Sequence, residues 1–159
     1  MSARADDPAA RIREYFVAVA QGPMAGLPIV NPALEVATIG FARQGEAWFG
    51  VLLTPWCMNL MLVPDPSCPC LRGEGDTQWW PFASGDYPFV VHHCHRLGCY
   101  HASSLFSPMF AFTTQAEAEA VAWQTLAQLH RPPERDAGGD AKRLSRRGFL
   151  RSVLAGGGP

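Results

Sequence analysis

The chain has 159 residues, a length typical of one domain with a single hydrophobic core. Apolar residues make up 48% and charged residues 17%, as in folded soluble proteins, and no segment approaches the roughly 20 consecutive apolar residues of a membrane-spanning helix. The formal charge of −1 is unevenly distributed: residues 1–130 hold six basic and eleven acidic side chains, and residues 131–159 hold seven and three. That basic stretch is too sparse for a nucleic-acid-binding face, so we expect no nucleic acid among the partners.

The N-terminal segment carries acidic residues near its start and lacks an apolar core, which excludes a secretory signal and predicts a cytoplasmic protein. The number of cysteines is odd. In a reducing compartment this favours free thiols or metal ligands over structural disulfides. The five cysteines are Cys57, Cys68, Cys70, Cys94 and Cys99.

The first predicted element is a helix over residues 9–20, because Ile12, Tyr15 and Phe16 recur at the spacing of one helical face. Gly22 and Pro23 end it. The following segment, residues 24–36, is interrupted by prolines and is predicted as an extended loop. Its apolar side chains are expected to anchor the loop in the core, and they are Leu27, Ile29, Val30 and Leu34.

The period then changes to two, which predicts strands. The expected strands cover residues 35–43, 46–55, 58–64, 79–82, 87–95 and 99–107. A helix capped by Thr113 or Thr114 is predicted over residues 114–130. The order predicts an α+β fold, an antiparallel meander with an N-terminal and a C-terminal helix that cover one face of the sheet. We expect one domain over residues 1–133, with residues 1–8 disordered, and a flexible basic tail over residues 134–159.

One candidate metal site lies in the segment HHCHRLGCYH. If Cys94 faces His101 in a hairpin, then His92, Cys94, Cys99 and His101 share one face and could hold zinc, and Cys68 and Cys70 could contribute further ligands. A small metal-binding or metal-delivery protein is therefore an alternative function. The spacing lacks paired Cys-x2-Cys loops, and a register slip of one residue would separate the four side chains, so we favour histidines on a surface strand and no metal.

Two segments combine Met, Trp and Phe with proline breaks, residues 54–61 and 104–112. Met is flexible and polarizable, and Trp offers a large contact area, so such segments suit a surface that binds apolar peptides. They are equally compatible with an ordinary core. No phosphate loop, nucleophile elbow or metalloprotease motif is present, and a Cys57 nucleophile lacks an identifiable base, so we expect a protein that is not an enzyme.

The C-terminal segment Ser145-Arg146-Arg147-Gly148-Phe149-Leu150 matches the S-R-R-x-F-L pattern of a twin-arginine export signal. An export signal needs an N-terminal site and a longer apolar region, so this one cannot direct export. The segment is interpreted either as a short basic helix or tail, or as a mimic of a partner's signal.

Taken together, these features resemble the nickel–iron hydrogenase assembly chaperones of the HybE/HupJ type. The similarity spans roughly residues 11–151, and T-P-W-x-M-N-L and S-L-F-S-P-M are its most specific parts. The matching segments are residues 26–28, 31–34, 40–41, 50–56, 58–60, 82, 84–85, 104–109, the helix at 114–130, and 146–147.

The resemblance implies a cytoplasmic chaperone without cofactor or catalytic residue that binds hydrogenase precursors and delays export of the complex. Its partners would be the small-subunit precursor with its twin-arginine signal, the large subunit, or both. Some relatives carry a rubredoxin module, and this chain lacks the Cys-x2-Cys pairs that such a module needs. The expected partner-binding residues are Pro55, Trp56, Met58, Asn59, Met61, Phe106, Pro108, Met109, Phe110, Arg146 and Arg147.

Overall fold

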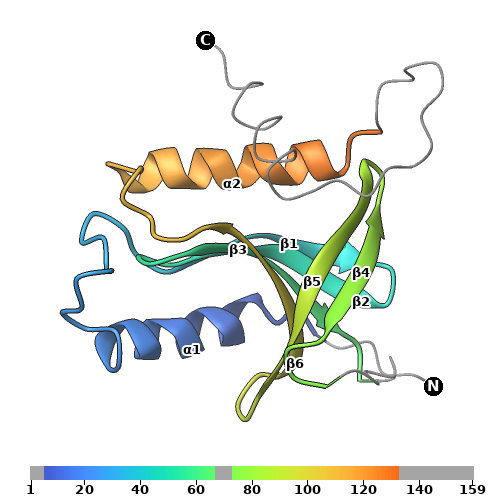
Figure 1. The fold of residues 1–159 in the computed structure, drawn as a ribbon, viewed down its shortest axis with the longest axis horizontal. Helices are drawn as coiled ribbons and strands as arrows, with labels where there is room; N and C mark the ends of the chain where they lie inside the picture. The colour runs from blue at the N-terminus through green and yellow to red at the C-terminus, as the bar shows by residue number, and fades with distance from the viewer. Residues whose placement is uncertain (1–5, 67–72, 133–159) are drawn as a thin grey trace.

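The computed structural model describes residues 6–66 and 73–132 (Figure 1). Cys68, Cys70, Arg146 and Arg147 lie outside the described residues, as does the whole predicted tail. The described chain forms two helices and one sheet. Its elements are α1 Ala9–Gln21, β1 Ala37–Gln44, β2 Ala47–Leu53, β3 Met58–Pro64, β4 Thr77–Phe82, β5 Gly85–Cys94, β6 Gly98–Phe106 and α2 Gln115–Leu129. The sequence predicted each of these helices and strands, with ends displaced by at most two residues.

The six strands form one antiparallel sheet in the order β1-β2-β3-β6-β5-β4. Strands β1 to β3 form one meander, and β4 to β6 form a second. The last strand, β6, joins the two meanders by pairing with β3. The predicted α+β fold with an antiparallel sheet and a helix at each end of the chain is therefore confirmed.

The two helices cover opposite faces of the sheet, so the prediction that both lie on one face is wrong. Figure 1 shows α2 on one side of the sheet and α1 on the other. In β2, Val51 and Leu53 pack in the same cluster as α2, and Leu52, between them, packs with Ile12 of α1. Alternating side chains of one strand therefore enter two separate cores.

A signal for this arrangement was present in the sequence. Strands β2 and β3 read as almost continuous apolar runs, AWFGVLL and MNLMLVP, rather than as alternating patterns. A strand that is buried on both faces has no solvent face to mark with polar residues. Such runs therefore favour a layer of structure on each side of the sheet.

The N-terminus of α2 is fixed by its own side chains, as the sequence predicted. The Thr114 hydroxyl accepts a hydrogen bond from the Glu117 backbone N–H at 3.2 Å. The Glu117 carboxylate accepts one from the Thr113 backbone N–H at 3.0 Å, and this bond, the largest contribution, lowers the pKa of Glu117 below its ordinary value. These reciprocal bonds satisfy N–H groups that a helix start leaves unpaired.

Candidate functional site: the loop end of the molecule

Three connecting segments meet at one end of the molecule, which we call the loop end. They are residues 22–36 after α1, residues 54–57 between β2 and β3, and residues 107–114 between β6 and α2. The Asn31 side chain is buried where they join and donates hydrogen bonds to the carbonyls of Met109 and Phe112, at 3.0 and 2.9 Å. Its backbone N–H donates to the Pro55 carbonyl at 2.9 Å. One asparagine thus ties segments that are up to 81 positions apart in the chain.

The β2–β3 connection is a tight turn organised by Thr54. Its hydroxyl accepts hydrogen bonds from the backbone N–H groups of Cys57 and Trp56, at 2.9 and 3.3 Å. The Thr54 backbone N–H donates to the Cys57 carbonyl at 2.8 Å. A side chain that satisfies the turn in this way holds Trp56 at the loop end while Pro55 stays buried.

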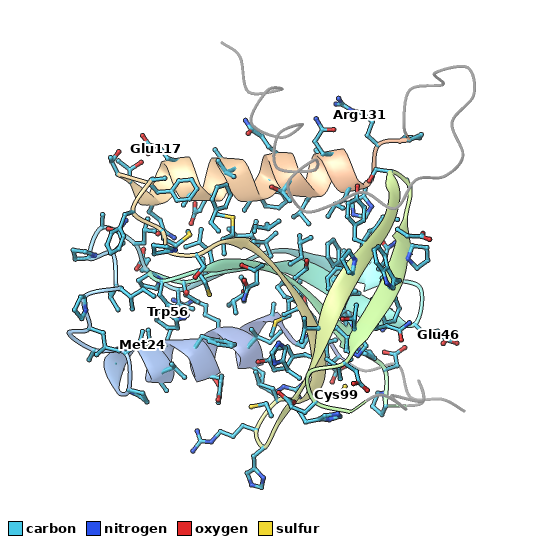
Figure 2. All side chains as sticks on the ribbon, in the orientation of Figure 1. Met24, Glu46, Trp56, Cys99, Glu117 and Arg131 are labelled. Carbon is cyan, nitrogen blue, oxygen red and sulfur yellow. The ribbon has the colours of Figure 1, made fainter. Side chains whose placement is uncertain are left out.

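Large apolar side chains are exposed at the loop end. Phe110 is 54% exposed, Leu27 43% and Ile29 40%. Met24 and Trp56 are half-buried, and Figure 2 shows both at the same end of the molecule as Glu117. We call this set the loop-end surface, and its members are Met24, Leu27, Ile29, Trp56, Pro108 and Phe110.

The exposure of Leu27 and Ile29 shows that the prediction of these residues as core anchors is wrong. Only Leu34 of the four predicted anchors is buried, and Val30 is half-buried. The loop runs outward because successive short turns, such as the bond from the Val30 N–H to the Leu27 carbonyl, keep residues 24–30 at the periphery. The prolines that mark this loop also keep it from joining the sheet, and they were the available signal for exposure.

The predicted partner-binding residues divide into three groups. Met58, Met61 and Met109 are at most 1% exposed, and Pro55 is also buried, so these four side chains build the cores and do not offer an open surface in this conformation. Pro108 and Phe110 are exposed. The half-buried members are Trp56, Asn59 and Phe106.

Acidic groups lie beside the loop-end surface, and basic groups are missing from its segments. Residues 22–36, 54–57 and 107–119 contain three acids and no Lys, Arg or His. Gln115 links the residues that carry two of these acids, since its side-chain N–H donates to the Glu35 backbone carbonyl at 3.3 Å and to the Glu119 carboxylate at 3.2 Å. The third is Glu117 at the start of α2. The loop-end surface is therefore apolar with an acidic rim.

The histidines and cysteines of the β5–β6 hairpin are not arranged as the candidate zinc site requires. Cys94 pairs with Gly98, and His92 pairs with Tyr100, so the register that the candidate site requires, with Cys94 opposite His101, differs from the observed one by three residues. An odd shift exchanges the faces. His92 and Cys94 therefore share the α1 side, and Cys99 and His101 share the other. The described residues contain no group of three or more His, Cys, Asp or Glu that could hold a metal ion.

His92 and His101 make local contacts instead. The His92 ring stacks on Tyr100, with centroids 5.1 Å apart, and its Nδ1 lies 3.3 Å from the Glu74 carboxylate. His101 is 4% exposed, and its Nδ1 accepts a hydrogen bond from the Trp80 indole N–H at 2.8 Å. Burial disfavours the imidazolium and lowers the pKa of His101 to about 4, so the ring is neutral at pH 7.

The cysteines correct one further expectation. Cys57 and Cys94 are free thiols, as predicted, but Cys99 is disulfide-bonded. Burial raises the pKa of the Cys57 thiol, and its nearest hydroxyl, Thr54 Oγ1 at 3.2 Å, is not a base. A nucleophilic cysteine needs a lowered pKa or an adjacent base, and the described residues give Cys57 neither of these.

The comparisons with known proteins agree with this fold. A family model described as NiFe-hydrogenase assembly, chaperone, HybE matches residues 7–152. The hydrogenase expression/formation protein HoxT of Azotobacter vinelandii is 44% identical over 147 residues, covering 90% of this chain and 94% of its own. The protein HupJ of Bradyrhizobium diazoefficiens is 33% identical and covers 86% and 82%.

The solution structure of HybE from Escherichia coli has the same fold, with a TM-score of 0.65 at 21% identity, covering 91% of this chain and 93% of that one. In the described residues, neither helix is both long and apolar enough to cross a membrane. The family description is that of an assembly chaperone. On the match over residues 7–152 and the 44% identity to HoxT, the chain belongs to the HybE family of nickel–iron hydrogenase assembly chaperones.

Proposed function

We propose that this chain binds precursor subunits of a nickel–iron hydrogenase in the cytoplasm, through the loop-end surface, before the assembled enzyme is exported. The observation that carries the proposal is the exposure of Leu27, Ile29 and Phe110 around the buried Asn31 junction. A small protein does not gain stability from apolar side chains held in water, and gathered apolar exposure is typical of a protein-binding surface.

The construction of the loop end supports binding rather than catalysis. Its backbone is held by the Asn31 and Thr54 hydrogen bonds, and the exposed side chains project from a fixed frame. A preorganised frame lowers the entropy that is lost on binding, and aromatic side chains such as Trp56 and Phe110 are frequent hot spots at interfaces. An apolar client segment fits the loop-end surface, because the exposed side chains of that surface are apolar.

The acidic rim adds a second requirement on the client. Glu35, Glu117 and Glu119 would attract a segment with basic residues next to apolar ones. A twin-arginine signal of a hydrogenase small subunit has this composition, a pair of arginines followed by apolar residues. Holding that signal would delay export until the large subunit has been loaded, which is the coordinating role that we propose.

The test is the affinity of purified chain for the small-subunit precursor, with and without its signal, and for the large-subunit precursor. We expect a Leu27→Ser, Phe110→Ser double variant to bind at least about tenfold more weakly, since truncation of a hot spot typically costs more than 1 kcal/mol. The matched control is Val90→Ser, which removes an apolar side chain that is 37% exposed on β5, away from the loop end.

Circular dichroism and thermal unfolding should show that all variants are folded, because the substituted side chains are exposed. Equal binding by the wild type, the double variant and the control would refute the assignment of the loop-end surface. Failure of the wild type to bind any precursor would refute the proposed function itself.

A further inference from the structure

We propose that the chain's own segment 145–150, Ser-Arg-Arg-Gly-Phe-Leu, binds the loop-end surface as an intramolecular competitor of the client. This inference rests on the proposed function, because it assigns a regulator to the same surface. The tail has the composition that the surface selects, with paired guanidinium groups followed by Phe149 and Leu150. The bound arrangement would place the arginines on the acidic rim and the apolar pair on the exposed side chains.

Charge complementarity supports this occupant. Residues 1–130 carry five more acidic than basic side chains, and residues 131–159 carry four more basic than acidic ones. The acids of the loop end, Glu35, Glu117 and Glu119, have no Lys, Arg or His within their own segments to neutralise them. Arg is suited to such a rim because its planar fork pairs with carboxylates through two parallel hydrogen bonds.

The length of the tail matches the distance it must cover. The described chain ends just after the C-terminus of α2, and the loop end lies at the N-terminus of the same helix (Figure 1). With 15 residues, α2 is about 22 Å long. The 14 residues from Pro133 to Arg146 could span at most about 48 Å when extended, and a coil of that length has a root-mean-square end-to-end distance of about 20 Å.

The agreement between the length of the connector and the distance along α2 determines how strongly the tail competes with the client. When the root-mean-square length of a connector equals the span, the effective concentration of the tethered segment is on the order of 1 mM. If the free segment binds with a Kd of about 0.2–1 mM, the tail would occupy the surface for about half to five-sixths of the time. Such occupancy weakens client binding about two- to sixfold. Clients that bind tightly would therefore displace the tail, and clients that bind weakly would not.

The experiment uses the full chain in three forms, the wild type, the variant Arg146→Gln, Arg147→Gln, and the control Lys142→Gln, Arg143→Gln. Both variants lose two charges from the tail, but only the first changes the S-R-R-x-F-L motif. We expect the first variant to bind the small-subunit precursor about two- to sixfold more tightly than the wild type. The control should remain within experimental error, and 0.5 M NaCl should reduce the difference.

A second readout needs no client. A fluorescent peptide with the sequence of residues 143–152 is titrated into the Arg146→Gln, Arg147→Gln variant and into the same variant carrying Phe110→Ser. We expect saturable binding to the former, with Kd below about 1 mM, and at least about tenfold weaker binding to the latter. Weaker binding of the peptide to wild type than to the tail variant would show that the tail occupies the surface.

The outcomes separate the two proposals. Absence of peptide binding, or equal effects of the two tail variants on client affinity, would overturn the tail inference and leave the proposed function standing. Peptide binding that depends on Phe110, in a chain that binds no hydrogenase precursor, would support the tail inference and overturn the proposed function.

Discussion

The loop end and the β5–β6 hairpin differ in the kinds of residue that their sequences contain. They also differ in whether the fold brings those residues together. The hairpin contains the segment with the densest chemistry, four histidines and two cysteines between residues 92 and 101. Its register distributes these side chains over two faces. The loop end contains few reactive groups, yet its three segments, distant in sequence, converge on Asn31.

The comparison shows that reactive residue types indicate a site only when the backbone brings them to one place. A difference of three residues in a hairpin register is enough to separate the ligands of a potential zinc site, because neighbouring side chains on a strand point to opposite faces. A binding surface has a weaker requirement. Apolar side chains need only be exposed together on a fixed frame, and at the loop end the frame consists of side-chain to backbone hydrogen bonds.

The largest effect is expected at the junction itself. Asn31→Ala removes the donor to two buried carbonyls and the acceptor of the Ala33 N–H, whose bond is 3.0 Å long. Leaving buried carbonyls unpaired should lower the free energy of unfolding by about 2–4 kcal/mol. Urea denaturation at pH 7 measures this loss. The control Gln78→Ala removes one local bond to Trp79 and should cost less than about 1 kcal/mol; equal losses would contradict the role of Asn31.

At the hairpin, the predicted effect depends on pH. The pKa of His101 is lowered by burial from 6.5 to about 4, so between these values the unfolded chain binds more protons than the folded chain. Stability should therefore fall as pH decreases from 6.5 to 4, by at most about 1.4 kcal/mol per pH unit from this group. His101→Gln should remove the part of this pH dependence of stability that comes from His101, while keeping a hydrogen-bond acceptor for the Trp80 indole N–H. The midpoints of urea unfolding at pH 4.5, 5.5 and 6.5 test this prediction. The same dependence of the midpoint on pH in the wild type and in His101→Gln would contradict it.

A smaller effect is expected for His92, which lies in the same hairpin. His92→Ala removes the stacking on Tyr100 and the contact with Glu74. Because the His92 and Glu74 side chains are 37% and 60% exposed, the free energy of unfolding at pH 7 should change by less than about 1 kcal/mol. Thermal unfolding provides the measurement. A loss comparable to that of Asn31→Ala would mean that the hairpin, rather than the loop end, is the more tightly coupled region.

The smallest expected effect concerns metal. Addition of equimolar zinc should leave the unfolding temperature of the wild type unchanged, and His92→Ala and Cys94→Ser should not alter that result. A ligand bound to the folded state alone raises the unfolding temperature. A zinc-dependent increase that disappears in both variants would mean that these residues share a site despite the observed hairpin register, and would return the metal-binding alternative to consideration.

Local patterns were sufficient to predict the helices, the strands and the antiparallel sheet, because periodicity and capping depend on residues near one another in the chain. The T-P-W turn illustrates this, since Thr54, Trp56 and Cys57 complete its hydrogen bonds among themselves. The prediction that both helices cover one face of the sheet was wrong, although the almost continuous apolar runs of β2 and β3 indicated burial on both faces.

The candidate site was predicted in part. The sequence drew attention to Trp56 and Phe110, but composition cannot distinguish the exposed Phe110 from the buried Met109 beside it. That difference depends on long-range contacts, because Asn31 binds the Met109 carbonyl and fixes which side of the loop faces inward. The hairpin register depends on how β6 is shared between β3 and β5, which also lies beyond local pattern.

The most direct test of the account is amide hydrogen exchange of the full chain, alone and with an excess of the small-subunit precursor. Binding at the loop end predicts that the precursor slows exchange in residues 24–31, 54–57 and 107–113, while residues 92–99 exchange as in the free chain. Slowed exchange confined to residues 92–99 would contradict the account and would place the binding surface at the hairpin.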